Sequence, residues 1–482
     1  MPPSSSPPNA PLPPPAPSRS GEHHTPDSVE ALTPHLEDYG TLTQNKNFIA
    51  LWVGQVFSQL ADRIILVVFV AMIVNHFGTN PNFKTNLYVA FTIPAILLTA
   101  VAGVFVDRWP RRTVLVATNL LRAVFVSFMP LVTHASLWAV YGLAFMISVA
   151  TQFFVPAEAA TIPMIVKKQD LIAANSLFTT TMMASVIFGF ALGDPLINIF
   201  RLSQVHWAIV GLFILSSLSL MFIKTPPPAI AQGENTNKTL SEAVDQFFFE
   251  LKDGITYIRQ NPVILNAILK LATLFCGVVV LCFLFMSFAE EFLYEDAKVA
   301  AQKFGYIIAA SGMGMALGAV LVGRFAGEFP RRIMVYGGFA TTGLWMLCLV
   351  LIAVIDRTNR VFTIPSMTLG PVYLDSIQFT FRMLYTYLFS TLMGVGAAFV
   401  AIPLQALLHE RIPEDKRGKI LGVQFTILST CSTLPAVATG LIIEHVGTCL
   451  VLELMGAPLL LVGIWGLLRK RRGDGYATTP DW

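Results

Sequence analysis

Five polar residues interrupt the apolar stretch 48–74. At about 100° per residue they occupy one face of a helix and its edge: Gln55, Ser58, Gln59, Asp62 and Arg63. A carboxylate in this setting can do proton chemistry, because burial favours its protonated form and a nearby arginine favours its ionised form. Movement of Asp62 relative to Arg63 or Arg122 would then load and release a proton. The alternative is a permanent Asp62–arginine pair that serves packing only.

Other apolar stretches also contain polar side chains that need a reason to be there. Arg122 shares a helix face with Thr118 and Asn119, and it could serve either a structural ion pair or ligand contact. Glu158 and Asp194 lie near the ends of their stretches, where we expect solvation. The residues that could line a pathway for substrate and proton are Gln55, Gln59, Asp62, Arg63, Arg122, Gln152 and Glu158.

The composition indicates which solvent surrounds these groups. Of the 482 residues, 54% are hydrophobic and 13% are charged, whereas soluble domains carry about 25% charged residues. The expected solvent is therefore lipid, and the net charge of +3 is too small to argue for nucleic acid as a partner.

Twelve apolar stretches come near the ~20 residues that a membrane-spanning helix needs. They lie at 48–74, 86–106, 112–132, 137–157, 175–199, 206–223, 264–288, 304–323, 333–355, 383–407, 418–444 and 449–468. The predicted fold class is an all-α membrane protein with twelve transmembrane helices. The last two stretches are so close in sequence that they should form a tight hairpin around Gly447.

The distribution of basic residues sets the expected orientation. Of 32 Lys and Arg residues, 22 fall on the side of the two termini and 7 on the other. Because basic residues accumulate in cytoplasmic loops, we expect both termini in the cytoplasm and the protein in the plasma (inner) membrane. The expected parts are a disordered Pro/Ser-rich tail, a six-helix half, a central loop, a second six-helix half and a tail: 1–44, 45–223, 224–263, 264–470 and 471–482.

The central loop contains an amphipathic pattern typical of a helix on the membrane surface. Its apolar face comprises Leu240, Val244, Phe247, Leu251, Ile255 and Ile258. Thr239 and Glu242 have the spacing of a capping box. The simplest interpretation is a linker helix between the two halves.

A short segment occurs twice in the chain. "GVFVDRWPRRTVLV", starting at Gly103, aligns with "GRFAGEFPRRIMVY", starting at Gly323. A weaker pair surrounds Pro156 and Pro403, and the long outer loop 356–382 accounts for its different offset. The chain is thus predicted to contain two parallel six-helix repeats, an organisation typical of transporters.

Two six-span halves with G-x-x-x-D-R-x-x-R-R between spans 2 and 3 resemble the major facilitator superfamily. The segments "LWVGQVFSQLADRI", "LLRA" and "PAEAATIPMIVKKQDLIAANSL" resemble its bacterial efflux branch, which includes enterobactin-exporter-like and macrolide-efflux-like proteins. The residues of the expected gating motif, with two from its second copy, are Gly103, Asp107, Arg108, Arg111, Arg112, Arg331 and Arg332. Pro110 departs from the usual glycine. The fifth-span exporter motif is half present, because "FGFALGDP" keeps Gly189 and Gly193 but has Phe190 and Asp194.

The resemblance implies roles for these charges. The cytoplasmic end of span 2 is a helix C-terminus, which favours cations, so Asp107 needs a partner. The family implies one at the start of span 11, near Lys416, Arg417 and Gly418. The motif would then act as an inner latch, and span 1 would line the central cavity. The competing interpretation is that these charges only fix the topology.

The sequence favours transport over catalysis. It has no metal-ligand pair, nucleophile elbow or P-loop, and "GMGMALG" at 312–318 is better explained by close helix packing at Gly314 and Gly318. We expect no cofactor, a proton gradient as energy source, a monomer, and export of an amphiphilic small molecule such as a drug or siderophore. Uptake, lipid flipping and a transport-dead sensor or scaffold are the alternatives.

Overall fold

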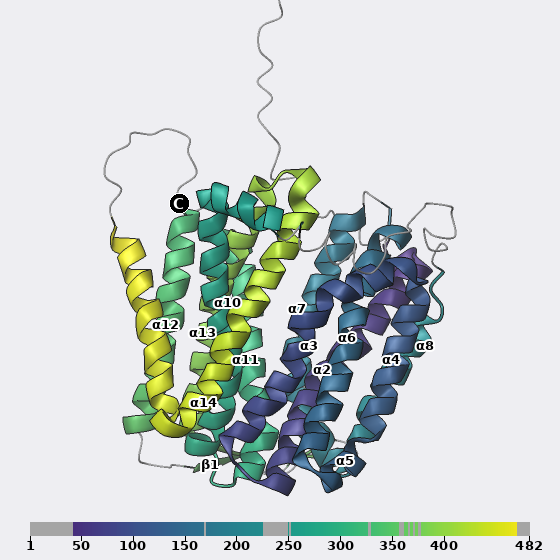
Figure 1. The fold of residues 1–482 in the computed structure, drawn as a ribbon. Helices are drawn as coiled ribbons and strands as arrows, with labels where there is room; N and C mark the ends of the chain where they lie inside the picture. Colours follow the sequence, from purple (N-terminus) through teal and green to yellow (C-terminus); the bar gives the residue numbers. More distant parts are fainter. Residues whose placement is uncertain are drawn as a thin grey trace, which may run out of the picture.

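The chain forms two groups of helices that lie side by side (Figure 1). The computed structural model describes residues 42–167, 170–224, 249, 252–325, 329–355, 361–364, 367–369, 372–374 and 377–469. The first group comprises α2 (Lys46–Phe77), α3 (Pro81–Arg108), α4 (Arg111–Ser127), α5 (Met129–Ala135), α6 (Leu137–Ile165), α7 (Leu171–Phe200) and α8 (His206–Leu220). The second comprises α10 (Pro262–Phe288) with its π-helical extension η4 (Ala289–Leu293), α11 (Ala297–Phe325), α12 (Arg331–Ile355), α13 (Phe381–Arg411) and α14 (Glu414–Leu468).

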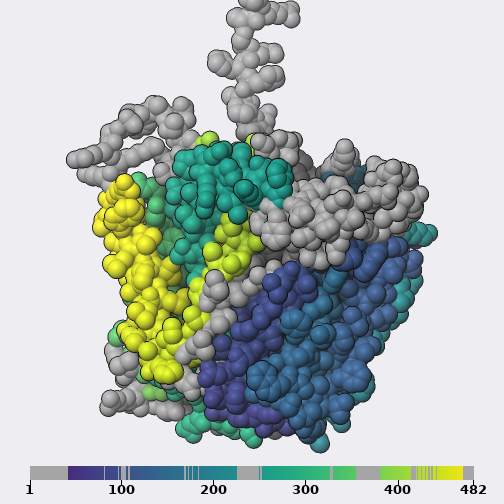
Figure 2. Space-filling view, in the orientation of Figure 1, coloured from purple at the N-terminus to yellow at the C-terminus, as the bar shows by residue number. Residues whose placement is uncertain are grey.

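The two groups contact each other along a few helices. In the space-filling view the purple-to-blue first group lies at the right and the teal-to-yellow second group at the left (Figure 2). Helix α11 packs against α7 and α2, and α14 packs against α3. We call the end with β1 and α5, at the bottom of Figure 1, the strand end, and the opposite end the Arg469 end.

Local sequence signals explain several helix boundaries. The side chain of Asn45 caps α2 by accepting hydrogen bonds from the backbone of Asn47 and Phe48 at 3.1 and 3.2 Å. The third predicted span, 112–132, is divided at Phe128 into α4 and α5, which are bent by 44°. Pro130 explains this break, because it lacks the N–H that would continue the α4 hydrogen-bond ladder.

The predicted hairpin around Gly447 is confirmed. Gly447 has φ +81° and interrupts the long α14 segment. This left-handed region is sterically open to glycine, so the chain reverses there without a longer loop. The close packing predicted for Gly314 is also confirmed, because a Cβ at this position would lie 1.8 Å from the carbonyl oxygen of Thr391.

All twelve predicted spans fall on helices, but fewer helices are clearly long and apolar enough to cross a membrane. Among the described residues eight meet this criterion, or nine if α4 and α5 form one bent span. The others are α3, the short α8 and the first part of α14. Large apolar side chains such as Trp138, Val320 and Leu461 are exposed on the bundle, as expected of a surface that faces lipid.

The expected outer loop contains β-structure that the all-α prediction did not include. Strand β1 (Val361–Ile364) pairs antiparallel with β4 (Ile377–Thr380), and β2 (Met367–Leu369) pairs with β3 (Val372–Leu374). Both ladders share one register, since Val361 faces Thr380 and Met367 faces Leu374. The four strands therefore follow the path of a single interrupted hairpin.

The expected tails and most of the central-loop helix lie outside the described residues. Within the central loop, 249 and 252–260 are helical, and Ile258 is buried. At the N-terminal side, residues 42–44 are helical and Leu42 is buried in an apolar cluster. The sequence analysis placed the start of the first six-helix half at residue 45, whereas packed residues already begin at Leu42.

Candidate functional site

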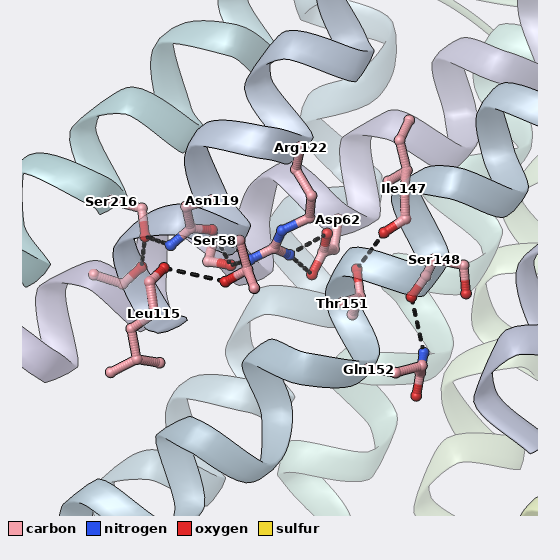
Figure 3. A network of polar contacts seen from close by, with 12 residues as sticks. Ser58, Asp62, Leu115, Asn119, Arg122, Ile147, Ser148, Thr151, Gln152 and Ser216 are labelled. Carbon is pink, nitrogen blue, oxygen red and sulfur yellow. Dashed lines mark hydrogen bonds and ion pairs between the residues drawn. The ribbon is translucent and has the colours of Figure 1, made fainter. Parts of the chain in front are cut away.

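A fully buried arginine forms the centre of a polar network inside the first group (Figure 3). Arg122 of α4 donates from Nη1 to both carboxylate oxygens of Asp62 on α2, at 3.0 and 3.1 Å. The Asp62 side chain is 24% exposed, whereas that of Arg122 is 0% exposed. The pair thus joins a sequestered cation to a carboxylate that remains partly accessible.

Further contacts compensate the burial of the Arg122 guanidinium. Its Nη2 donates to Ser58 Oγ at 2.9 Å and also to Asn119 Oδ1. The rings of Phe154 and Phe213 each lie 4.7 Å from the guanidinium carbon. Such cation–π contacts contribute about 0.5–2 kcal/mol each, which helps to offset the cost of removing the cation from water.

The network continues toward α8. Asn119 Nδ2 donates to Ser216 Oγ at 2.8 Å, and Ser216 Oγ donates to the carbonyl of Gly54 at 2.7 Å. Figure 3 shows Ser216, Asn119, Ser58, Arg122 and Asp62 in a row across α8, α4 and α2. All these helices belong to the first group, so the contacts can move together when that group moves as a unit.

The other expected pathway residues lie around this network with fewer contacts. Gln55 is buried, and its Nε2 donates to Phe178 O at 3.5 Å while its Oε1 has no hydrogen-bond partner in the described part of the chain. Gln59 is half-buried. Gln152 donates to Ser148 O of its own helix at 3.2 Å. Arg63 lies against Gly189 of α7, and Asp62 pairs with Arg122 rather than with Arg63.

The expectation that Glu158 is solvated is wrong. Its side chain is buried on α6, and its Oε1 has no hydrogen-bond partner among the described residues. Phe154, one helical turn earlier on the same face, packs on Arg122. Glu158 thus lies on the α6 face that turns toward the network, where a buried carboxylate oxygen without a hydrogen-bond partner is costly.

The gating-motif arginines contact the ends of neighbouring helices within each group. Arg111 Nη1 donates to Ala160 O of α6 at 3.3 Å. Arg331, its counterpart in the repeat, pairs with Glu410 of α13 at 2.5 and 2.6 Å. Arg332 donates to Gly466 O at 2.6 Å, and Arg112 is exposed. Arg111 thus joins α4 to α6 in the first repeat, and Arg331 joins α12 to α13 at the equivalent place in the second repeat.

The remaining motif residues lie where the latch hypothesis places them along the chain. Gly103, Asp107 and Arg108 are in the last turns of α3, and Lys416 and Arg417 are in the first turn of α14. The side chains of Asp107, Arg108, Lys416 and Arg417 are outside the described part of the structure. The expected Asp107 contact therefore stays a prediction.

Polar contacts between the two groups occur at the strand end, and the sequence analysis missed them. Lys84 of α3 forms an ion pair with Glu290 of η4, and their side chains are 4% and 14% exposed. Asp194 of α7 accepts a hydrogen bond from the hydroxyl of Tyr306 on α11 at 2.9 Å. Asp194 is buried, so its expected solvation is also wrong. The only signal in the sequence was a set of isolated charges near the ends of apolar stretches.

The profile of the Major Facilitator Superfamily matches residues 51–386. The chain belongs to the Major Facilitator Superfamily. This membership makes it a multi-pass membrane transporter of small molecules rather than an enzyme.

Curated relatives cover nearly the same length as this superfamily member. The chain is 25% identical over 426 residues to the uncharacterized MFS-type transporter YfiS of Bacillus subtilis (strain 168). The aligned region covers 88% of this chain and 94% of YfiS. It is 21% identical over 421 residues to macrolide efflux protein A of Streptococcus pyogenes, covering 86% and 94%. Its fold matches a mutant of the nucleoside transporter NupG with a TM-score of 0.64 at 13% identity, covering 87% and 99%.

Proposed function

We propose that this superfamily member exports amphiphilic small molecules by alternating access, in exchange for protons. The observation that carries the proposal is the Asp62–Arg122 pair, in which a partly exposed carboxylate is held by a fully buried cation. Charges at this depth are costly and usually functional. Export of a drug-like solute is supported by the similarity to macrolide efflux protein A.

The site combines polar and apolar surface in a way that suits such a substrate. Gln55, Gln59 and Asp62 provide hydrogen-bonding groups on α2, and Leu66 continues the helix with apolar surface. A pathway of this kind binds an amphiphile through apolar contact and positions it through few polar groups. Asp62 is the group that exchanges protons with the aqueous pathway in this proposal, because its side chain is 24% exposed while its partner Arg122 is fully buried.

The proposed topology has twelve spans in two six-helix halves. The protein lies in the plasma (inner) membrane, and both termini are in the cytoplasm. The helical structure of all twelve predicted segments and the excess of basic residues on one side support it. In this orientation the strand end is external and the Arg469 end is cytoplasmic. The contacts of Lys84 and Asp194 then close the external side.

The orientation can be tested with reporters at two positions. A reporter fused after Trp482 should give a cytoplasmic signal, and a reporter inserted at Thr363 should give an external signal. The physical reason is the positive-inside bias over the short loops. A fusion of alkaline phosphatase and one of green fluorescent protein at each position provide opposite readouts. Equal signals at the two positions would contradict the twelve-span topology.

The gating motif is proposed to close the internal side. Asp107, at the end of α3, would contact the first turn of α14 when the cytoplasmic ends of the halves come together. Contacts within each half by Arg111 and Arg331 would keep the attached helices rigid. External and internal closure would then alternate as the halves rock against each other.

A susceptibility screen tests the proposed export. A host that lacks its own efflux pumps should survive higher concentrations of some macrolides or other amphiphiles when it makes this protein, and the Asp62→Asn variant should give less protection at equal membrane abundance. Compounds should accumulate less in the protected cells. Increased accumulation would indicate uptake instead, and an unchanged profile across the panel would count against export of drug-like amphiphiles.

A further inference from the structure

A cavity of about 330 Å³ opens at the strand end of the first group, and the proposed transport mechanism does not use it. Its polar lining comes from three chain segments, namely Asn75 and His76 in the last turn of α2, Thr133 and His134 on α5, and Ser203 after α7. Among the described residues that line it, the two histidines are the groups that titrate near neutral pH or bind metal ions readily. The chemistry of this cavity is therefore that of two imidazoles.

The two histidine rings are close enough to bind one ion together. The ring centres of His76 and His134 are 5.3 Å apart, and their planes are at 86°. Two imidazoles that each bind the same tetrahedral Zn²⁺ at about 2.0–2.1 Å have ring centres about 5 Å apart. The spacing of the two rings thus matches that of a pair of histidines on one metal ion.

A hydrogen bond selects the nitrogen of His76 that can bind an ion. Its Nδ1 lies 3.0 Å from the carbonyl oxygen of Met72, one turn earlier on α2. A carbonyl oxygen can only accept, so Nδ1 carries the proton of the neutral ring and Nε2 keeps its lone pair. Metal-binding histidines commonly donate their other N–H in this way, which fixes the orientation of the ring. His76 and His134 are both exposed, so an ion can reach them from water.

The ends of three helices favour a cation in this cavity. Helices α2, α5 and α7 end at Phe77, Ala135 and Phe200, and each contributes to the lining with residues at or just after its end. The last carbonyl groups of a helix lack partners within the helix and carry partial negative charge. This charge stabilises a bound cation and disfavours an anion. The surroundings of the two imidazoles therefore suit a metal ion.

We propose that His76 and His134 form a binding site for one divalent transition-metal ion of the kind that imidazole ligands suit, such as Zn²⁺ or Cu²⁺. In the described part of the chain no group of three or more His, Cys, Asp or Glu residues could hold a metal ion, so water completes the coordination and the ion exchanges. The sequence showed no metal-ligand pair because the two histidines belong to different helices.

The bound ion would join two helices that also carry the buried ion pair. Helix α2 carries both Asp62 and His76, whereas α4 carries Arg122 and continues after the bend at Phe128 into α5 with His134. A metal ion at the strand end would thus hold α2 and α5 together beyond the Asp62–Arg122 contact. This site goes beyond the proposed export and does not depend on it.

Titration of the purified full-length chain with Zn²⁺ in detergent tests the site. The affinity tag is removed and the five native cysteines are replaced, because histidine tags and thiols also bind Zn²⁺. Isothermal titration calorimetry should show one ion bound per chain. The unfolding temperature should rise with Zn²⁺ concentration, because a ligand that binds the folded state stabilises it. Mg²⁺ prefers oxygen ligands and should cause no such rise.

The variants separate the two imidazoles from other surface groups. His76→Gln and His134→Gln should each weaken Zn²⁺ binding at least about tenfold, since losing a direct ligand costs no less than losing a residue that orients one. Both side chains are exposed, so each variant should unfold at the parent temperature in EDTA. The control His445→Gln removes another exposed histidine, beside Gly447 on α14, and should bind Zn²⁺ as the parent does.

Three results would overturn the proposed metal site. One is an unchanged Zn²⁺ affinity in either His76→Gln or His134→Gln. The second is equal stabilisation by Mg²⁺, which would assign binding to oxygen atoms rather than to imidazoles. The third is an equal loss of affinity in His445→Gln, which would show that Zn²⁺ binds to scattered surface histidines. None of these measurements involves transport, so they stand or fall separately from proton-coupled export.

Discussion

Replacing Asp62 by asparagine is expected to destabilise the protein more than replacing Asp62 and Arg122 together. The single change leaves a fully buried guanidinium without its anionic partner, and removing one partner of a buried pair costs about 3–5 kcal/mol. The 24% exposure of Asp62 places the expected loss at the lower end of that range. The difference is measured by heating each variant in detergent and quantifying the protein that remains folded by size-exclusion chromatography with fluorescence detection.

The double variant Asp62→Asn/Arg122→Gln separates the two interpretations of this pair. It removes both charges, so it should recover most of the stability lost in Asp62→Asn. If the pair serves proton coupling, the recovered protein still lacks export driven by a pH gradient. Recovery of gradient-driven export together with stability would show that the pair serves packing only.

Breaking the Lys84–Glu290 ion pair is expected to open the external side. In Lys84→Met or Glu290→Gln, the closed state holds one buried charge without its partner, whereas the open state hydrates that charge. Ser287 lies beside Lys84 at the contact between the groups, so Ser287→Cys, in a background without the five native cysteines, reports opening through its rate of labelling by an impermeant maleimide. This labelling rate should therefore rise about fivefold or more in each single variant. Neutralising both residues should give a smaller increase, because no unpaired charge is then buried.

Two control variants distinguish gate opening from general loosening. Arg331→Gln removes an exposed ion pair inside the second group, and exposed pairs contribute little, so labelling should stay unchanged. Asp107→Asn, at the opposite end of the bundle, should favour internal opening and lower the external labelling rate. If all four single variants raise labelling equally, the Lys84–Glu290 pair is no specific gate.

The helical bundle was largely predictable because each span carries its own local signal. Apolar stretches of the required length predicted the helices, and Gly447 predicted the reversal in α14. The face of α2 that carries Ser58 and Asp62 followed from helical periodicity, and that face meets Arg122. These features depend on the spacing of neighbouring residues along one helix.

Contacts between helices were less predictable because they depend on packing. The sequence left two arginines as partners for Asp62, and the choice of Arg122 follows from how α4 lies against α2. Lys84 and Glu290 are 206 positions apart and meet only when the two groups are assembled. For the same reason Glu158 and Asp194 were expected in water, although neighbouring helices bury both.

The strand pairs at 361–380 escaped the prediction for a different reason. Their residues lie between two strong apolar spans, so hydropathy predicts only a connection there. The antiparallel register from Val361–Thr380 to Met367–Leu374 requires the segment to turn back on itself. This is a property of strand pairing rather than of hydropathy.

Proton-coupled export is tested most directly by transport into proteoliposomes in which the cytoplasmic face of the protein points outward. The substrate is an amphiphile against which the protein protects cells in the susceptibility screen. With an acidic lumen and a neutral bath, protons leave as substrate enters, so we expect the substrate to accumulate in the lumen above its concentration in the bath. Collapse of the pH gradient with a protonophore should release the excess, and Asp62→Asn vesicles should reach equilibrium only. Accumulation that is equal with and without the gradient would contradict proton-coupled export.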